Sequence, residues 1–292
     1  MSKSTNLLVF LIFSKMLLVS TQEDNFTFLI SGGYRPRQHT LVKYIVSMQI
    51  NEYSPYFGSA HFCAGSIINP RIILTAAHCV WDNMLEKPRN ETTVKIIAKT
   101  PNRLKKTQHT EVLEVEEIVV HPNFDFYRKS HDIAILHLTS NINVDDVYAQ
   151  SIELTDGPAE VEKQCTVLGW GRIFADGPLA ADALYINIYL LQTSACNLIH
   201  PSFFGMLCSS DLEDPEKDVC KGDSGGPLIC DGKLTGLVSF GTGCGVDPAV
   251  YSDVWYFRDW IYAVVKGVKG GKSANSISNY KIWLLLLLWI VS

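Results

Sequence analysis

Short apolar runs separated by turn residues fill the middle of the chain. From residue 32 onward, runs rich in Ile, Val and Leu are bounded by Gly, Pro, Asn or Asp, as in residues 45–50, 72–75, 93–97 and 234–239. β-Branched residues in short runs with frequent turn signals are typical of strands in a sandwich or barrel. The pattern therefore predicts an all-β fold.

One segment near the end of this region departs from the pattern. Residues 254–265 form a long aromatic and aliphatic run with charges on one side. This arrangement favours an amphipathic helix over a strand. We therefore expect a terminal α-helix at residues 254–265.

The N-terminus is basic and then apolar. Lys3 is followed by the apolar run 7–13, which is typical of a secretory signal peptide. We assign the signal peptide to residues 1–20, with cleavage near Ser20 or Thr21. Asn25 and Asn90 each begin an Asn-x-Thr triplet, the form of an N-glycosylation acceptor in an exported chain.

The C-terminus changes composition after residue 265. Residues 266–276 are small and basic, and residues 282–291 are apolar, about half of the roughly 20 residues that a spanning helix needs. Small residues, a polar spacer and a short apolar end resemble the signal for a lipid (GPI) anchor, with attachment between Gly270 and Ser276. A short tail anchor and an amphipathic tail bound to a partner are the alternatives for residues 266–292.

Charge and cysteine content narrow the class of protein. The net charge of −5 over 292 residues gives no footprint for nucleic-acid binding. Eight cysteines, an even number, favour disulfides in an oxidising compartment, hence a secreted or extracellular protein. A metal site would need close pairs of the Cys-x-x-Cys kind, and the sequence has none.

Glycines crowd around one serine in residues 220–227, Cys-Lys-Gly-Asp-Ser-Gly-Gly-Pro. The serine, Ser224, is a weak nucleophile at neutral pH, so it needs a base within hydrogen-bond reach and a third group that orients the base. Matching candidates occur in residues 75–79, Thr-Ala-Ala-His-Cys, and residues 131–136, His-Asp-Ile-Ala-Ile-Leu.

These three motifs, in the order His, Asp, Ser, resemble the trypsin-like serine endopeptidases of the chymotrypsin fold over residues 30–265. The resemblance implies two six-stranded antiparallel β-barrels packed together with a C-terminal α-helix, with the barrel boundary near residue 155. His78 and Asp132 would then come from the first barrel and Ser224 from the second.

The resemblance also implies the roles of these side chains. Ser224 would attack the scissile carbonyl, His78 would take and return the proton, and Asp132 would fix the imidazole tautomer. The backbone N–H groups of Gly222 and Ser224 would form the oxyanion hole. A secreted homologue that binds or regulates without catalysis, or remains zymogen-like, is the alternative function, but such homologues usually lack one of the three residues. The remaining histidines are expected to be ordinary.

The same resemblance implies a substrate pocket. Asp218 matches the acid at the pocket floor, which selects Arg or Lys before the cut, and residues Ser239, Phe240 and Gly241 match the wall that pairs with substrate backbone. Two positions depart from the trypsin pattern: Ala249 stands where a glycine lines the pocket, and Val219 stands where a small or hydroxyl residue lies beside the acid. Both changes predict a narrower and less polar pocket.

Further expectations follow from the family pattern. Cys63 would pair with Cys79, Cys165 with Cys230, Cys196 with Cys208, and Cys220 with Cys244. After removal of a propeptide at residues 21–29, the new amine of Ile30 would pair with Asp223. Because Leu29 replaces the usual basic residue, we expect a chymotrypsin-like or elastase-like activator.

No cofactor and no metal are expected. The region between His78 and Asp132 carries Arg103, Lys105 and Lys106 where a calcium loop would be acidic. Protein or peptide substrates and serpin-type or other protease inhibitors are the expected partners, with possible attachment to the outer cell surface through the C-terminal tail.

Overall fold

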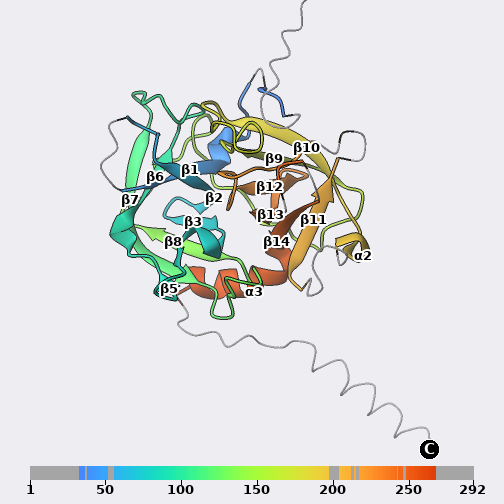
Figure 1. The fold of residues 1–292 in the computed structure, drawn as a ribbon. Coiled ribbons are helices and arrows are strands. Elements are labelled where there is room, and N and C mark those ends of the chain that lie inside the picture. The colour runs from blue at the N-terminus through green and yellow to red at the C-terminus, as the bar shows by residue number, and fades with distance from the viewer. Residues whose placement is uncertain are drawn as a thin grey trace, which may run out of the picture.

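A computed structural model describes residues 33–36, 38–51, 56–196, 204–211, 214, 217–241, 243–245 and 248–267. The signal peptide, the propeptide, Asn25, Ile30 and the tail from residue 268 lie outside the described residues. The structure is mostly β, with two closed antiparallel barrels side by side and a terminal helix, α3, along their common edge (Figure 1). The predicted fold class is therefore confirmed.

The first barrel runs in the order β1-β2-β3-β8-β7-β6 and the second in the order β10-β11-β14-β13-β12-β9. The first consists of β1 (Ile45–Ile50), β2 (His61–Asn69), β3 (Ile72–Thr75), β6 (Val94–Ala98), β7 (Glu111–Val120) and β8 (Ala134–Leu138). The second consists of β9 (Gln164–Gly169), β10 (Leu184–Leu190), β11 (Met206–Ser210), β12 (Pro227–Cys230), β13 (Lys233–Phe240) and β14 (Ala249–Asp253).

Short elements decorate the loops. They are the hairpin of β4 (Trp81–Asp82) and β5 (Lys87–Pro88), the 3-10 turns η1 (Val42–Tyr44), η2 (Ala77–Cys79) and η3 (Glu91–Thr93), and the helix α2 (Thr193–Cys196). Asn90 is exposed at the start of η3, where its side chain accepts a hydrogen bond from the Thr92 N–H. The Asn90 triplet is therefore accessible on the surface.

The apolar runs become strands because each buries side chains on a barrel core. One cluster fills the first barrel, around residues such as Met48, Ile73 and Leu136. Another fills the second, around Val167, Leu228 and Tyr251. Each fully buried aliphatic or aromatic side chain contributes roughly 1.5 to 3 kcal/mol to the stability of the fold.

Helix α3 (Val254–Val265) begins at Asp253, whose carboxylate accepts hydrogen bonds from the N–H groups of Trp255 and Tyr256. Such an N-cap stabilises a helix by about 1 kcal/mol. The buried face, Val254, Phe257 and Ile261, packs in a third cluster with residues of both barrels. The helix therefore stabilises the contact between the barrels as well as its own position.

Strand register places the expected site residues at one rim. Thr75, the last residue of β3, pairs with Ala134, the first residue of β8. The loop that follows β3 carries His78, and the loop that precedes β8 carries Asp132. The two side chains therefore begin from adjacent strand ends although 54 positions separate them.

Candidate active site

His78 lies in η2, a single turn that is tied down on both sides. A disulfide joins Cys79 to Cys63 on β2, and the Thr75 hydroxyl donates to the Ala64 carbonyl at 2.8 Å. The His78 side chain keeps 17% of its surface exposed. The turn is thus fixed to the barrel while the imidazole stays accessible to a substrate.

Asp132 holds His78 by two hydrogen bonds. The carboxylate accepts from His78 Nδ1 at 2.7 Å and from the His78 backbone N–H at 2.8 Å. Its side chain is fully buried. Burial alone would raise the pKa of Asp132, but the charge and hydrogen bonds of His78 and the hydroxyl of Ser239 hold it below its ordinary value. An ionised Asp132 requires the proton on Nδ1, which leaves Nε2 free as a base.

The second barrel also binds Asp132. The Ser239 hydroxyl of β13 donates to the carboxylate at 2.5 Å, and the Ser252 hydroxyl of β14 donates to the Asp132 carbonyl at 2.6 Å. Asp132 therefore joins the two barrels at the site. Sequence reasoning assigned Ser239 to the substrate-binding wall and missed this contact, because no local pattern marks a bond between residues 107 positions apart.

The turn that carries Ser224 is packed against the loop of His78. The Ala64 N–H donates to the Ser224 carbonyl at 2.8 Å. A side chain on Gly225 would place its Cβ 2.1 Å from Thr75 Oγ1 and 2.4 Å from the Ala64 carbonyl oxygen, and the φ of Gly225 is +75°. Only glycine fits this contact. Within the described ranges no hydrogen bond joins the Ser224 hydroxyl to His78, and in unliganded sites such bonds are often long.

Asp223 fixes the same turn through its buried carboxylate. Its carboxylate accepts from the N–H groups of Gly171 and Cys220 at 2.7 and 3.0 Å. Burial raises its pKa to about 6, against the lowering effect of these two hydrogen bonds. No Lys, Arg or His of the described residues lies within ion-pair distance of Asp223.

Comparisons with known proteins agree with this geometry. A family model described as Trypsin matches residues 30–261. Trypsin-1 of Salmo salar is 32% identical over 247 residues, covering 83% of this chain and 91% of the relative. Serine protease 1 of Rattus norvegicus is 30% identical over 237 residues, 80% of this chain and 88% of the relative. The chain belongs to the trypsin family.

In this trypsin-family chain the described structure contains four disulfides, which are the same pairs that the resemblance implies. They join Cys63 to Cys79, Cys165 to Cys230, Cys196 to Cys208, and Cys220 to Cys244. The first and last hold the loops of His78 and Ser224. Cys63, His78 and Cys79 also form the one described group of three possible metal ligands, but disulfide sulfurs are not the thiolates that bind metals.

The residues expected to form the pocket lie in the second barrel or in loops beside it. Asp218 is 6% exposed and accepts hydrogen bonds from the N–H groups of Val219 and Gly245 at 2.7 and 3.1 Å. Val219 and Ala249 are buried in one cluster. The Cys220–Cys244 disulfide ties the loop of Asp218 to the segment at residues 243–245. The space at Gly241 is open, with no atom closer than 3.8 Å to an added Cβ.

Sequence reasoning treated His61 as ordinary, but it contacts the turn that carries Ser224. His61 Nε2 is 3.0 Å from the Gly222 carbonyl oxygen, and Nδ1 is 2.8 Å from the Ser47 hydroxyl. Burial lowers the pKa of His61 to about 4. The hydrogen bond to Gly222 acts to raise this pKa, and the charge of Arg103 lowers it by a smaller amount. The imidazole is therefore neutral, and it donates to Gly222 from Nε2 and accepts from Ser47 at Nδ1.

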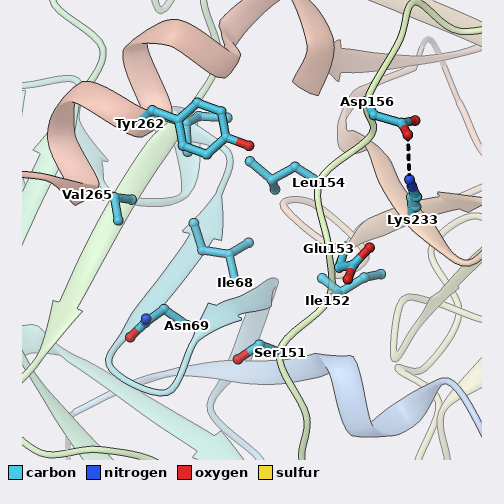
Figure 2. Close-up of a pocket in the computed structure, with 11 residues that line it drawn as sticks. Ile68, Asn69, Ser151, Ile152, Glu153, Leu154, Asp156, Lys233, Tyr262 and Val265 are labelled. Atoms are coloured by element: carbon cyan, nitrogen blue, oxygen red, sulfur yellow. Dashed lines mark hydrogen bonds and ion pairs between the residues drawn. The ribbon is translucent and has the colours of Figure 1, made fainter.

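A groove of about 420 Å³ opens elsewhere, between the end of β2, the connection at residues 151–156 and the last turn of α3 (Figure 2). Its lining is mainly apolar, with an ion pair of 2.7 Å between Asp156 and Lys233 at one end. Among the described residues, no histidine or cysteine lines it. Its lining does include Ser151 and Glu153, but the candidate active site is the place where a buried carboxylate orients an imidazole, at Asp132 and His78.

Proposed function

We propose that this chain is a serine endopeptidase that hydrolyses peptide bonds through an acyl-enzyme. The observation that carries the proposal is the bond between His78 Nδ1 and the buried carboxylate of Asp132. It orients Nε2 as a base for the Ser224 hydroxyl, which attacks the scissile carbonyl. His78 then returns the proton to the leaving amine, and water repeats the sequence to release the acyl group.

The oxyanion of each tetrahedral intermediate is proposed to bind the N–H groups of Gly222 and Ser224. Gly222 has a φ of +108°, a conformation that glycine adopts without strain. Removing one such donor typically costs about 3 to 4 kcal/mol of transition-state stabilisation. The contacts of Asp223 with Gly171 and Cys220 support this turn.

We further propose cleavage after Arg or Lys. Asp218 is buried, and a carboxylate with so little water around it gains most from a cationic partner. The guanidinium group is suited to bidentate pairing with such a carboxylate, and the ammonium of Lys reaches it as a point charge. A preference for Phe, Leu or Ala would show that Asp218 does not govern selection.

One experiment tests both proposals. A panel of fluorogenic peptides that vary the residue before the cut is applied to activated wild type and to Ser224→Ala. Wild type should cleave the Arg and Lys peptides and react with an organophosphonate, and Ser224→Ala should do neither while keeping the wild-type circular dichroism spectrum. Wild type with Ile30 as its N-terminal residue but without activity or labelling would favour the non-catalytic regulatory function.

An extracellular location is proposed from the four disulfides. The lipid anchor remains a proposal from the tail sequence, residues 266–292, most of which lies outside the described residues. The described helices are too short or too polar to cross a bilayer. A phosphatidylinositol-specific phospholipase should release the protein from intact cells, whereas retention with residues 282–291 still present by mass spectrometry would contradict the anchor.

A further inference from the structure

Arg103 is a buried arginine whose side chain is held by backbone carbonyls. It lies in the loop between β6 and β7 of the first barrel and is 6% exposed. Its Nε donates to the Ala180 carbonyl at 2.7 Å, Nη2 to the Leu179 carbonyl at 3.2 Å, and Nη1 to the Gly58 carbonyl at 2.6 Å. Two of these carbonyls belong to the second-barrel side of the molecule, so the guanidinium links the two halves.

The charge of Arg103 has no carboxylate partner within ion-pair distance in the described part of the chain. Burial lowers its pKa, although a guanidinium stays protonated in proteins. A buried cation is destabilising unless its donors are satisfied. Its three bonds to carbonyls are charge-assisted and directional, because the planar group fixes all its donors at once.

The backbone beside Arg103 is joined to the same segment. The Arg103 N–H donates to the Ala181 carbonyl at 2.9 Å, and the Ala183 N–H donates to the Pro101 carbonyl at 2.7 Å. The Asn102 side chain donates to Asp182 at 2.8 Å. The backbone of residues 101–103 is thus fixed in place, and the guanidinium of Arg103 extends from it toward Leu179 and Ala180.

Leu179 and Ala180 close a hairpin that begins at Gly171. The Ala180 N–H donates to the Gly171 carbonyl, and the Ile173 N–H donates to the Pro178 carbonyl, both at 3.0 Å. Holding the carbonyls of residues 179 and 180 therefore also holds the opposite arm at residues 171–173.

That opposite arm contacts the turn of Ser224 at three points. The Arg172 N–H donates to the Lys221 carbonyl at 2.9 Å, and the Gly171 N–H donates to the Asp223 carboxylate at 2.7 Å. A Cβ built on Gly222 would lie 2.7 Å from Leu179 Cδ2 and 3.0 Å from Gly171 Cα. Gly222 is therefore packed directly against both arms of the hairpin.

We propose that Arg103 is a positioning residue for the oxyanion donor Gly222, acting through the hairpin at residues 171–180. The inference rests on the proposed function, in which the Gly222 N–H binds the oxyanion. Arg103 does not touch substrate. It fixes the hairpin surface against which Gly222 packs, and so fixes the direction of an N–H that must meet the oxyanion within a few tenths of an ångström.

The test compares activated wild type with Arg103→Gln and Arg103→Lys. Neither substitute reproduces the three-carbonyl fork, although Lys keeps the charge. We expect kcat to fall about 10- to 100-fold in both, with KM changed less than about 3-fold, because a displaced donor weakens the transition state more than the bound substrate. Inactive wild type would defeat the proposed function, whereas variants with wild-type kcat would defeat only this inference.

Two matched inhibitors separate positioning from general loss of structure. A peptide aldehyde built on the best substrate forms a tetrahedral adduct whose oxyanion needs the donor, whereas the corresponding peptide alcohol forms none. The variants should lose affinity for the aldehyde in proportion to kcat and keep wild-type affinity for the alcohol. Equal loss for both ligands would overturn the proposal and leave Arg103 a structural residue.

The control is Arg71→Lys. Arg71 Nε also donates to a backbone carbonyl, that of Leu138 at 2.7 Å, but Arg71 pairs with exposed Glu116 and contacts neither the hairpin nor the Ser224 turn. Its kcat and aldehyde affinity should equal those of wild type. If both Arg103 variants fail to fold, Leu179→Ala tests the same path, because it removes the side chain that packs on Gly222. Wild-type kcat in Leu179→Ala would then contradict the proposal.

Discussion

The methyl group of Ala249 is the smallest feature to which we assign a function. Ala249 is buried at 1% exposure in the cluster that contains Val219. If Ala249 lines a pocket with Asp218 at its floor, as the family pattern implies, its methyl should crowd a guanidinium more than an ammonium, which is smaller. Val219 acts in the other direction, because it offers Lys no hydroxyl partner.

Ala249→Gly should therefore raise kcat/KM for an Arg substrate relative to the matched Lys substrate, by about 10-fold, the lower end of what one methylene changes in a pocket. The ratio is measured with two peptides that differ only at that residue. The companion variant is Val219→Ser, which should raise kcat/KM for the Lys substrate relative to the Arg substrate. An unchanged Arg/Lys ratio in Ala249→Gly would mean that the methyl does not line the occupied pocket.

Two stacked histidines packed against α3 predict how stability depends on pH. His121 and His131 stack with ring centroids 4.9 Å apart, and both contact Phe257 of α3. Burial, and then the charge of His131, lowers the pKa of His121 to about 4, and burial also lowers the pKa of His131. The folded state therefore favours neutral rings, whereas the unfolded chain protonates near the ordinary pKa of 6.5.

The unfolded state binds these protons more readily. The contribution of the two histidines to the free energy of unfolding should therefore be fully present above pH 6.5 and be lost as the pH decreases toward 4. His131→Asn keeps a residue that tolerates the left-handed φ of +53° at this position and removes one ring. The free energy of unfolding, measured with urea between pH 7 and 4.5, should fall less steeply for the variant than for wild type. Parallel curves would rule out the pair as the source of the slope.

At the scale of elements, the segment at residues 33–36 bears on activation. Tyr34 pairs with Tyr185 of β10 through two backbone hydrogen bonds of 2.9 and 3.0 Å. Tyr185 in turn pairs with Leu168, the residue before Gly169, which lies against Asp223. Tyr34 is thus about two strand spacings, roughly 10 Å, from Leu168. The four residue-to-residue steps from Ile30 to Tyr34 span at most about 14 Å, enough to carry a new amine toward Asp223.

We predict that cleavage after Leu29 by a chymotrypsin-like protease activates the precursor and that trypsin does not. The amine of Ile30 would pair with Asp223, whose pKa burial raises to about 6 in the absence of that cation. Loss of one partner of such a pair costs about 3 to 5 kcal/mol, so Asp223→Asn should lose most activity. New N-termini are sequenced after each digestion and activity is assayed.

Leu29→Lys is the control for this prediction, since trypsin should then activate the chain. Full activity in a precursor that still carries Leu29, or wild-type activity in Asp223→Asn, is the result that the mechanism does not allow.

The elements themselves were largely predictable from the sequence. The apolar runs at 45–50 and 72–75 and the helix at 254–265 have the observed bounds, and the runs at 93–97 and 234–239 differ by a residue at their ends. Each of these elements buries either a continuous apolar run or one apolar face, and that burial leaves a local pattern in the sequence. The disulfide pairs were available only through the family resemblance, since spacing does not fix connectivity.

Contacts made by closure of the two halves were not predictable. His61 and Gly222 are 161 positions apart, and Arg103 and Ala180 are 77 positions apart. Nothing beside His61 or Arg103 in the sequence marks the partner. Their roles depend on which carbonyl the other half presents, and that is decided only when both barrels have formed and docked.

For the whole molecule, α3 and the barrel interface form one apolar cluster in which residues of both halves are interleaved. The proposed catalytic groups lie at the same interface, with His78 and Asp132 on one side and Ser224 on the other. The proposed site therefore cannot assemble before the barrels dock.

The hydrogen bonds from the hydroxyls of Ser239 and Ser252 to Asp132 make the proposed activity sensitive to the alignment of the two barrels. They attach Asp132 of the first barrel to strands of the second. The value of kcat should therefore report how well the two barrels are aligned. A displacement of about 1 Å at such a site can reduce the rate about 100-fold, long before a strand melts. In rising urea, kcat should decline at concentrations where circular dichroism and tryptophan fluorescence are still native. Coincident loss of all three signals would mean that the two barrels never slip without unfolding.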